Sequence, residues 1–165
     1  MGIFGKTSTS VKINNKRKIS IEELVGKKYN SYYKDVFEVF DKGENKRHFN
    51  IYALIFSPYW YIYKRMTFFG ISIIGLQVVL FTIAFYLTNP MTISLYCLSY
   101  LLYLRSGFYG EYDYYKRMLS YKEFSNQIDD KFKDRFLNDK SGDDLYMTIC
   151  WVVGTIIIYV LAYYL

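Results

Sequence analysis

The distribution of charge constrains this chain more than any other feature of its sequence. All 36 charged residues lie outside two stretches, residues 66–104 (39 residues) and residues 145–165 (21 residues). A helix needs about 20 apolar residues to cross the hydrocarbon core of a bilayer, and an isolated segment in lipid can satisfy its backbone only as a helix. We therefore predict an all-α integral membrane protein. A very apolar hairpin in a soluble core is the alternative.

The first stretch is long enough for two crossings. Thr88-Asn89-Pro90 lies in its middle and combines a loop-forming residue with a proline, which cannot continue the helix before it. We predict a transmembrane hairpin over residues 66–110, with one span at about 67–87 and the next running from 91 toward 109. A third transmembrane helix is predicted over residues 145–165.

Arg105 interrupts the second predicted span. Residues 91–104 would cover only about 21 Å at a rise of 1.5 Å per residue, so this span must continue past Arg105. One interpretation is that Arg105 snorkels, with its methylene groups in lipid and its guanidinium at the headgroups. The other is that it forms an intramembrane charge pair with Glu111 or Asp113 and marks a functional site.

The basic residues predict the orientation. The chain up to residue 65 contains 13 Lys and Arg, residues 105–144 contain the other eight, and the hairpin turn and the C-terminal stretch contain none. Cytoplasmic segments are enriched in Lys and Arg, so we predict a multi-pass protein of the cell (plasma or inner) membrane with a cytoplasmic N-terminus and an external C-terminus. The first 18 residues have no apolar core, so no signal peptide is expected. Residues expected to anchor the chain at the membrane interface are Tyr59, Trp60, Tyr63, Lys64, Arg65 and Trp151.

The N-terminal part is predicted to be cytoplasmic and in two pieces. Residues 1–19 are interpreted as a flexible basic arm that contacts anionic lipid headgroups, with nucleic acid an unlikely partner. The basic cluster of this arm comprises Lys12, Lys16, Arg17 and Lys18. Residues 20–48 are predicted to form an amphipathic helix and a turn, because Ser20 and Glu23 make a capping box and apolar residues follow with helical spacing. Its apolar face needs a partner, either the membrane surface or the next segment.

Residues 49–65 form a predicted aromatic segment that is interfacial or re-entrant. The uncharged part, residues 49–63, is too short to span and contains Pro58. A fourth span is the alternative.

Residues 111–144 are predicted to form a second cytoplasmic amphipathic helix, ending near residue 138. An apolar stripe recurs every four residues, and Asp129 and Lys133 are expected to pair on the other side of the helix. The stripe comprises Phe124, Ile128, Phe132 and Phe136. It either packs under the hairpin or docks a partner.

The segment from Phe49-Asn50 to Lys64-Arg65-Met66 carries a resemblance to a known family. Together with the run that starts at Leu24, it resembles a bacterial inner-membrane family catalogued as domain of unknown function 2628. The motif residues are Gly26, Phe49, Asn50, Ala53, Pro58, Trp60 and Met66. The chain departs from the family pattern at Tyr52, Ser57, Glu111 and Asp113. The resemblance implies a membrane hairpin behind a short cytoplasmic part, and the family has no established activity.

No catalytic, metal-binding or cofactor-binding residues are predicted. His48 is the single histidine and is interpreted as a solvated loop residue, and Cys97 and Cys150 lie within the predicted spans. Gln77 is the only amide or acid in the spans apart from Asn89 in the turn, and it is expected to mark helix packing.

We therefore expect a non-enzymatic structural or adaptor protein that needs no cofactor. Its partners would be the lipid bilayer, anionic lipid headgroups, and another membrane or cytoplasmic protein or a second copy of the chain. The alternative function is a subunit of an oligomeric transporter or channel, because three helices cannot enclose a pore alone.

Overall fold

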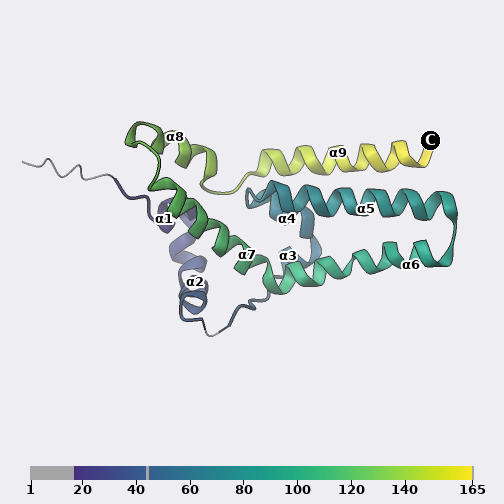
Figure 1. The fold of residues 1–165 in the computed structure, drawn as a ribbon, viewed down its shortest axis with the longest axis horizontal. Coiled ribbons are helices and arrows are strands. Elements are labelled where there is room, and N and C mark those ends of the chain that lie inside the picture. Colours follow the sequence, from purple (N-terminus) through teal and green to yellow (C-terminus); the bar gives the residue numbers. More distant parts are fainter. Residues whose placement is uncertain (1–16, 44, 165) are drawn as a thin grey trace, which may run out of the picture.

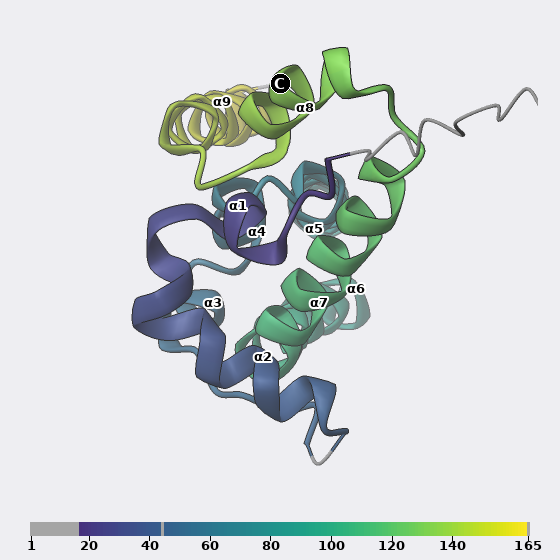
Figure 2. The same ribbon diagram turned by 90° about the vertical axis from the view of Figure 1, so that its left-hand side faces the viewer.

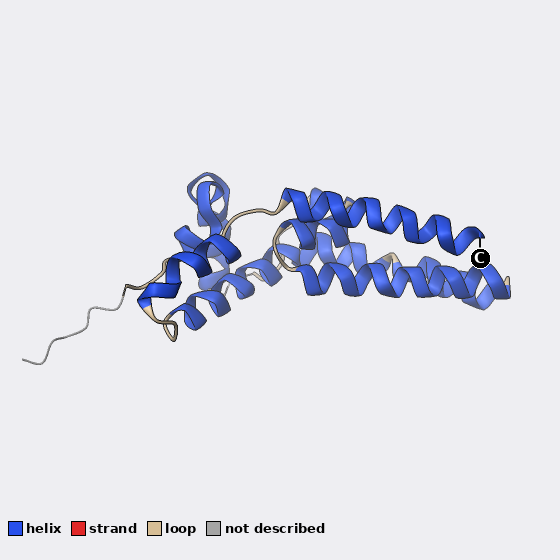
Figure 3. Cartoon of the chain, turned by 90° about the horizontal axis from the view of Figure 1, so that it is seen from above, coloured by secondary structure: helices blue, strands red, loops and turns tan. Residues whose placement is uncertain are grey.

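The described residues form an elongated, all-helical molecule with two distinct ends. The computed structural model describes residues 17–43 and 45–164, and the regular elements in those ranges are all helices. Helices α5, α6 and α9 lie side by side as an apolar arm, whereas α1, α2, α8 and the second half of α7 gather at the other end as a charged module (Figures 1 and 3). The elements are α1 (Ile21–Val25), η1 (Gly26–Lys28), η2 (Tyr29–Tyr33), α2 (Lys34–Asp41), α3 (Ile51–Ile55), α4 (Ser57–Tyr63), α5 (Thr67–Leu87), α6 (Pro90–Ser99), α7 (Leu101–Ser125), α8 (Asp130–Lys140) and α9 (Leu145–Tyr164).

Two helices of the apolar arm are long and apolar enough, by length and composition, to cross a membrane. They are α5, with 21 residues, and α9, with 20 residues. Only 28% of the most apolar window of α5 and 6% of that of α9 are buried. A core helix of a soluble protein would be mostly enclosed, so neither helix has the environment expected of the soluble-hairpin alternative.

The second predicted span is divided between two helices, so two helices and not the predicted three are long and apolar enough to be candidate spans. Within the described residues the candidate spans number two. The chain breaks at Tyr100, where tight turns replace the α-helical pattern: the Tyr100 N–H donates to the Cys97 carbonyl, and the Tyr103 N–H donates to the Tyr100 carbonyl. Beyond the break, α7 continues through Arg105 into the charged module, so it is only partly apolar.

The turn between α5 and α6 is confirmed, and its residue types explain it. Thr88 adopts a left-handed conformation (φ 44°) that ends α5. The Asn89 side chain accepts a hydrogen bond from the Met91 N–H at 2.9 Å, and Pro90 occupies the first turn of α6. Proline suits this position because the first N–H groups of a helix have no partner within it.

The N-terminal helices pack against α7, which was not among the partners that the sequence suggested (Figure 2). Ser20 caps α1 as predicted, accepting from the Glu23 N–H at 3.1 Å, and α2 ends at Asp41. The helix between them is not continuous, because η1 and η2 follow the positive-φ residue Gly26 (φ 76°). Aromatic contacts with α7 bury the apolar face of the N-terminal helices. The ring centroids are 5.2 Å apart for Tyr33 and Tyr114 and 5.1 Å apart for Phe37 and Tyr115.

Part of the predicted flexible arm is fixed to α8. Arg17 pairs with Asp134 at 2.6 Å, and the buried Lys133 donates to the Arg17 backbone carbonyl. Lys133 pairs with Asp130 at 2.8 Å rather than with Asp129, because Asp129 precedes the first turn of α8. Ile19 is 1% exposed and belongs to the core, Arg17 and Lys18 are exposed, and Lys12 and Lys16 lie outside the described residues.

The aromatic segment forms two short helices instead of a span. α3 and α4 are separated at Phe56, and Pro58 lies in the first turn of α4. α3 packs on α7, while α4 packs on α5 and α9. The close approach to α7 depends on a glycine: a Cβ on Gly110 would lie 3.0 Å from the Trp60 ring. This segment therefore joins the apolar arm to the charged module.

The helix predicted over residues 111–138 is divided. α7 ends at Ser125 and α8 begins at Asp130. The turn folds α8 back so that the rings of Phe124 and Phe136 meet at 5.9 Å. Phe132 remains 50% exposed, so the apolar stripe is only partly covered by the chain itself.

Gly70 provides a sharp test of the packing between α4 and α5. A Cβ at Gly70 would lie 2.5 Å from the Pro58 carbonyl oxygen and 2.5 Å from Ile62 Cγ1, whereas a Cβ at Gly75, in the same helix, meets no atom within 4 Å. We expect Gly70→Ala to destabilise the protein by about 1–3 kcal/mol through overpacking. Thermal unfolding of the purified chain in detergent measures this, and Gly75→Ala is the matched control. Equal stability of the two variants would contradict the close packing of α4 on α5.

Candidate functional site

One cavity is a groove that lies where the apolar arm meets the charged module. Its volume is about 850 Å³, and α3, α4, α9 and the η1–η2 segment form its walls. We call it the aromatic groove. Its lining residues are Lys28, Ser31, Tyr32, Tyr33, Phe49, Asn50, Ile51, Tyr52, Phe56, Tyr59, Trp60, Tyr63, Lys64, Thr148 and Val152.

Large apolar side chains of the groove are open to the surroundings. Phe49 is 52% exposed, Tyr52 is 66% exposed and Phe56 is 53% exposed. Phe49 lies just before α3 and Phe56 directly follows it, so both side chains project from the ends of this short helix. Contiguous exposed apolar surface of this kind is typical of interaction sites.

Most of the motif residues lie in or directly behind the aromatic groove. Phe49, Asn50 and Trp60 line it. Ala53 and Met66, at 0% and 2% exposed, pack in the core behind it. The motif therefore specifies the wall of the groove and its attachment to α7.

One polar cluster closes the groove on the side of α9. Lys64 Nζ lies 2.6 Å from one oxygen of Asp143, and Lys28 Nζ lies 2.8 Å from the other. Lys64 is 3% exposed, and its ammonium lies 4.8 Å from the ring centroid of Tyr33 and 5.2 Å from that of Tyr114. Two cations thus share one carboxylate, and ring faces replace part of the water around the inner cation.

The protonation behaviour of this cluster follows from burial and pairing. Burial lowers the pKa of Lys64, and the hydrogen bond to Asp143 opposes that shift. Burial alone would raise the pKa of Asp143, but the hydrogen bonds from Lys28 and Lys64 outweigh it, so the pKa of Asp143 is lowered. Asp143 is therefore ionised at neutral pH.

A second polar cluster lies behind Asn50. The Glu111 carboxylate on α7, which is fully buried, accepts from Asn50 Nδ2 at 2.6 Å and from the Tyr32 hydroxyl at 2.8 Å. Its other oxygen lies 2.9 Å from His48 Nδ1. Asn50 also caps α3, because its Oδ1 accepts from the Tyr52 N–H at 2.9 Å. His48 is a loop residue whose side chain is 38% exposed, and it also contacts this buried carboxylate, which the sequence did not predict.

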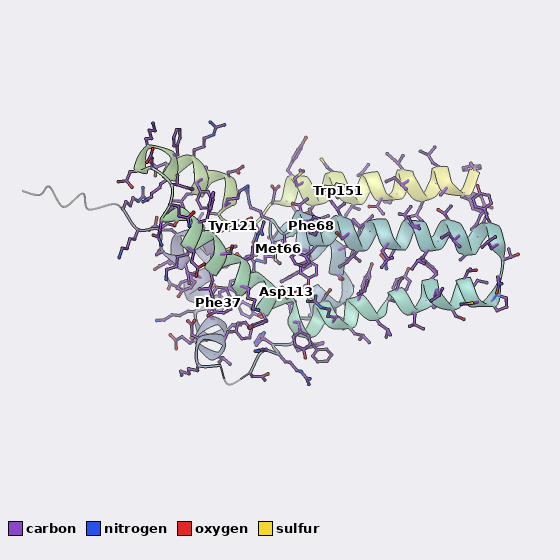
Figure 4. The ribbon with its side chains drawn as sticks, viewed as in Figure 1. Phe37, Met66, Phe68, Asp113, Tyr121 and Trp151 are labelled. Carbon is purple, nitrogen blue, oxygen red and sulfur yellow. The ribbon has the colours of Figure 1, made fainter. Side chains whose placement is uncertain are left out.

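The predicted charge site of Arg105, Glu111 and Asp113 is separated into two. Arg105 pairs with Asp113 at 2.9 Å, and the Tyr61 hydroxyl donates to the same carboxylate at 2.8 Å. Asp113 lies on α7 where that helix enters the charged module (Figure 4). The Arg105 side chain is 50% exposed, so this is a paired cation at the surface and not a buried charge. Glu111 belongs to the cluster behind Asn50.

The predicted anchor residues have different environments. Trp60 and Lys64, at 6% and 3% exposed, are largely enclosed by protein and line the aromatic groove. Tyr59, Tyr63 and Trp151 are partly exposed. Arg65 donates to a backbone carbonyl at the end of α8, and Arg17 and Lys18 of the basic cluster are exposed.

Sequence reasoning missed the cluster of Lys28, Lys64 and Asp143 beside the groove. Lys64 and Asp143 are 79 positions apart, and spacing carries no signal for such a contact. The one local signal was the acidic pair Asp143-Asp144 before the last apolar stretch, which is typical of a helix start. The Asp144 side chain does cap α9, because it accepts from the Met147 N–H at 3.0 Å. Among the described residues no group of three or more His, Cys, Asp or Glu could hold a metal ion.

Asp143→Asn tests the cluster on the α9 side of the groove. It leaves Lys64 buried without a carboxylate, which is expected to cost about 3–5 kcal/mol of unfolding free energy. The matched control is Asp139→Asn, which removes an exposed pair with Lys140 and should change stability little. Thermal or denaturant unfolding in detergent measures both variants.

The same variants give a pH signature. Because the pKa of Asp143 is lowered below its ordinary value of 3.8, its contribution to stability is complete above that value and is lost as the pH falls through the folded-state pKa. Asp143→Asn should therefore flatten the acid limb of the stability curve. An unchanged acid limb, or equal stability of the two variants, would contradict the cluster.

The part of the chain that contains the motif matches a known protein family. The family described as "Protein of unknown function (DUF2628)" matches residues 17–119, which include the motif and the groove wall of α3 and α4. No curated protein and no solved structure matches the chain. The chain belongs to the DUF2628 family of proteins of unknown function.

Proposed function

We propose that this chain is a membrane protein with three spans, a cytoplasmic N-terminus and an external C-terminus. Two of the spans are α5 and α9, and the third crossing is made by α6 and the first turns of α7 together, on either side of the break at Tyr100. The turn between α5 and α6 and the end of α9 lie at the same end of the molecule, away from the charged module (Figures 1 and 3). Neither the turn nor the end of α9 contains Lys or Arg, as expected for external segments of a membrane protein.

Within that arrangement, the aromatic groove binds one anionic phospholipid, and the protein acts as a non-enzymatic lipid-dependent adaptor in the cell membrane. The groove itself carries the proposal. It is apolar along most of its wall and lies at the level where α5 and α9 begin, which is the level of the headgroups and upper acyl chains. An acyl chain suits such a wall because burial of apolar surface is the main favourable term.

The charge at the rim favours an anionic headgroup. Lys28 and Lys64 face the single carboxylate of Asp143, so the cluster carries one uncompensated positive charge. Lys28 is 55% exposed and can bind a phosphate in addition to Asp143. Lys64 is enclosed by protein and cannot contact the headgroup, but its positive charge attracts an anion at the rim. A basic residue near a membrane surface is worth about 1 kcal/mol with anionic lipid.

The Arg105–Asp113 pair gives less support to the alternative of a transporter subunit. Both carboxylate oxygens of Asp113 already have donors, from Arg105 and Tyr61. A conducting site needs polar groups that a moving ion can bind in turn. The pair therefore favours a structural role at the start of the charged module.

The orientation is tested by labelling single cysteines. In a chain with Cys97→Ser and Cys150→Ser, Asn89→Cys lies in the hairpin turn and Asn126→Cys lies between α7 and α8. A membrane-impermeant maleimide added outside intact cells should label the first and should label the second only after permeabilisation. Labelling of Asn126→Cys in intact cells would overturn the proposed orientation.

Lipid occupancy of the groove is tested by quenching of Trp60. The chain has two tryptophans, so Trp151→Phe leaves Trp60, which lines the groove, as the sole fluorophore. In nanodiscs, phosphatidylglycerol with brominated acyl chains should quench Trp60 more strongly than brominated phosphatidylcholine. Lys28→Gln should reduce the preference for the anionic lipid about fivefold, as expected from ~1 kcal/mol per basic residue.

Matched variants separate the groove from general charge and general lipid contact. Lys27→Gln removes the same charge from a neighbouring exposed residue outside the groove and should keep the preference. Val152→Phe fills the groove and should weaken quenching, whereas Val153→Phe, on an exposed face of the same helix, should not. Equal effects within either pair, or no quenching of Trp60, would overturn the lipid proposal.

A further inference from the structure

A second cavity lies inside the apolar arm. Its volume is about 320 Å³, and it is separate from the aromatic groove apart from the shared residue Tyr59. Its other lining residues include Gln77 on α5, Tyr96 on α6, Tyr100 between α6 and α7, Tyr103 on α7, and Tyr159 on α9. We call it the tyrosine cavity. It collects polar groups from every helix of the arm.

The depth of the tyrosine cavity sets what could enter it. Gln77 is the eleventh of the 21 residues of α5, so it lies about 15 Å along that helix at 1.5 Å per residue. This is the middle of the hydrocarbon layer in the proposed arrangement, about 30 Å thick. No charged side chain lines the cavity. An occupant must therefore be uncharged and soluble in lipid.

One polar group in the cavity wall has no partner. Gln77 is 4% exposed, and its Oε1 accepts from the Tyr103 hydroxyl at 3.2 Å. Its Nε2 has no hydrogen-bond partner among the described residues. A buried donor without an acceptor costs about 1–3 kcal/mol, so an amide left in this state at mid-membrane depth indicates that something else supplies the acceptor.

The remaining wall is built of aromatic rings that carry hydroxyl groups. The hydroxyls of Tyr96 and Tyr100 are 2.9 Å apart, and the ring of Phe81 touches those of Tyr96 and Tyr159 at 5.8 and 5.0 Å. Ring walls of this kind favour a flat π-system in an offset or edge contact. Tyr100 is 45% exposed, so the cavity is open to the surroundings beside it.

We propose that the tyrosine cavity binds the headgroup of a lipid-soluble quinone. A quinone is planar and uncharged, and its two carbonyl oxygens accept hydrogen bonds. One carbonyl takes a hydrogen bond from the unpartnered amide of Gln77, and a tyrosine hydroxyl donates to the other. The isoprenoid tail leaves past Tyr100 into lipid. The inference concerns binding alone and rests on the proposed membrane insertion of α5, α6 and α9.

Photolabelling tests the site directly. The full chain in nanodiscs free of quinone is irradiated with an azido-substituted benzoquinone that carries one isoprene unit, and labelled peptides are mapped by mass spectrometry. We expect saturable labelling on peptides that contain Tyr100, Tyr103 or Tyr159, competed by the unmodified quinone. Gln77→Leu should weaken apparent binding about fivefold, the loss expected for one hydrogen bond.

Two controls keep the inference falsifiable. Gln77→Leu keeps the side-chain volume and removes the unpartnered Nε2 together with the hydrogen bond from Tyr103, and because these two losses offset each other, the variant should unfold at about the temperature of the parent chain. Tyr86→Phe removes an exposed hydroxyl from the same helix outside the cavity and should bind as the parent does. Labelling that does not saturate, spreads evenly over the exposed faces, or is unchanged in Gln77→Leu would overturn the proposal and leave water as the occupant. Failure of membrane insertion would appear separately, in the cysteine labelling of the hairpin turn.

Discussion

The ion pair between Lys64 and Asp143 is the contact on which the arrangement of the whole chain depends. Lys64 lies just before α5, and Asp143 lies just before α9, so their 2.6 Å contact fixes the starts of both candidate spans beside each other. Flanking backbone bonds reinforce it: Asp144 N–H donates to the Tyr63 carbonyl at 2.8 Å, and Gly142 N–H donates to the Leu24 carbonyl at 3.0 Å. One junction therefore joins the N-terminal helices, the aromatic segment and the last helix.

α7 is the platform on which these parts assemble. Its first turns belong to the apolar arm, and its remainder forms one wall of the charged module. Glycines on its buried face permit close contact: a Cβ at Gly107 would lie 2.9 Å from Leu54 Cβ, and Gly110 accommodates Trp60. The carboxylate of Glu111, one residue further on, then meets Asn50 from the same short helix. Shape and charge on α7 thus select the same partner segment.

The sequence predicted those features that depend on local chemistry. The limits of α5, the turn at Asn89-Pro90, the cap at Ser20 and the all-helical class follow from apolar length and from side chains that satisfy nearby N–H groups. The continuity of α7 from the apolar arm into the charged module was missed, because the charged residues from Glu111 onward were assigned to a separate helix although charged residues are good helix formers. Contacts between distant positions, such as His48 with Glu111, leave no periodic signal in one sequence.

Tyrosine explains how a small chain can contain so many buried polar groups. The sequence has 20 tyrosines, and their hydroxyls reach acids that lie on or beside α7: Tyr32 donates to Glu111, Tyr61 to Asp113 and Tyr115 to Asp41. Each ring also fills apolar space, so one residue supplies both packing and the hydrogen bond that a buried carboxylate requires. Phenylalanine at these positions would keep the volume and remove one hydrogen bond from each acid, although Glu111 would still accept from Asn50 and Asp113 from Arg105.

Four buried side-chain atoms of the described residues lack a hydrogen-bond partner, and Gln77 Nε2 is the one that lies in the apolar arm. Tyr103 satisfies one side of its amide, as tyrosines do for the acids of the charged module, but no described residue satisfies the other side. Five tyrosines line the cavity around this amide, and none of them accepts a hydrogen bond from Nε2. Since a leucine would fill the same space without that cost, the open donor is best explained by an acceptor that comes from outside the chain.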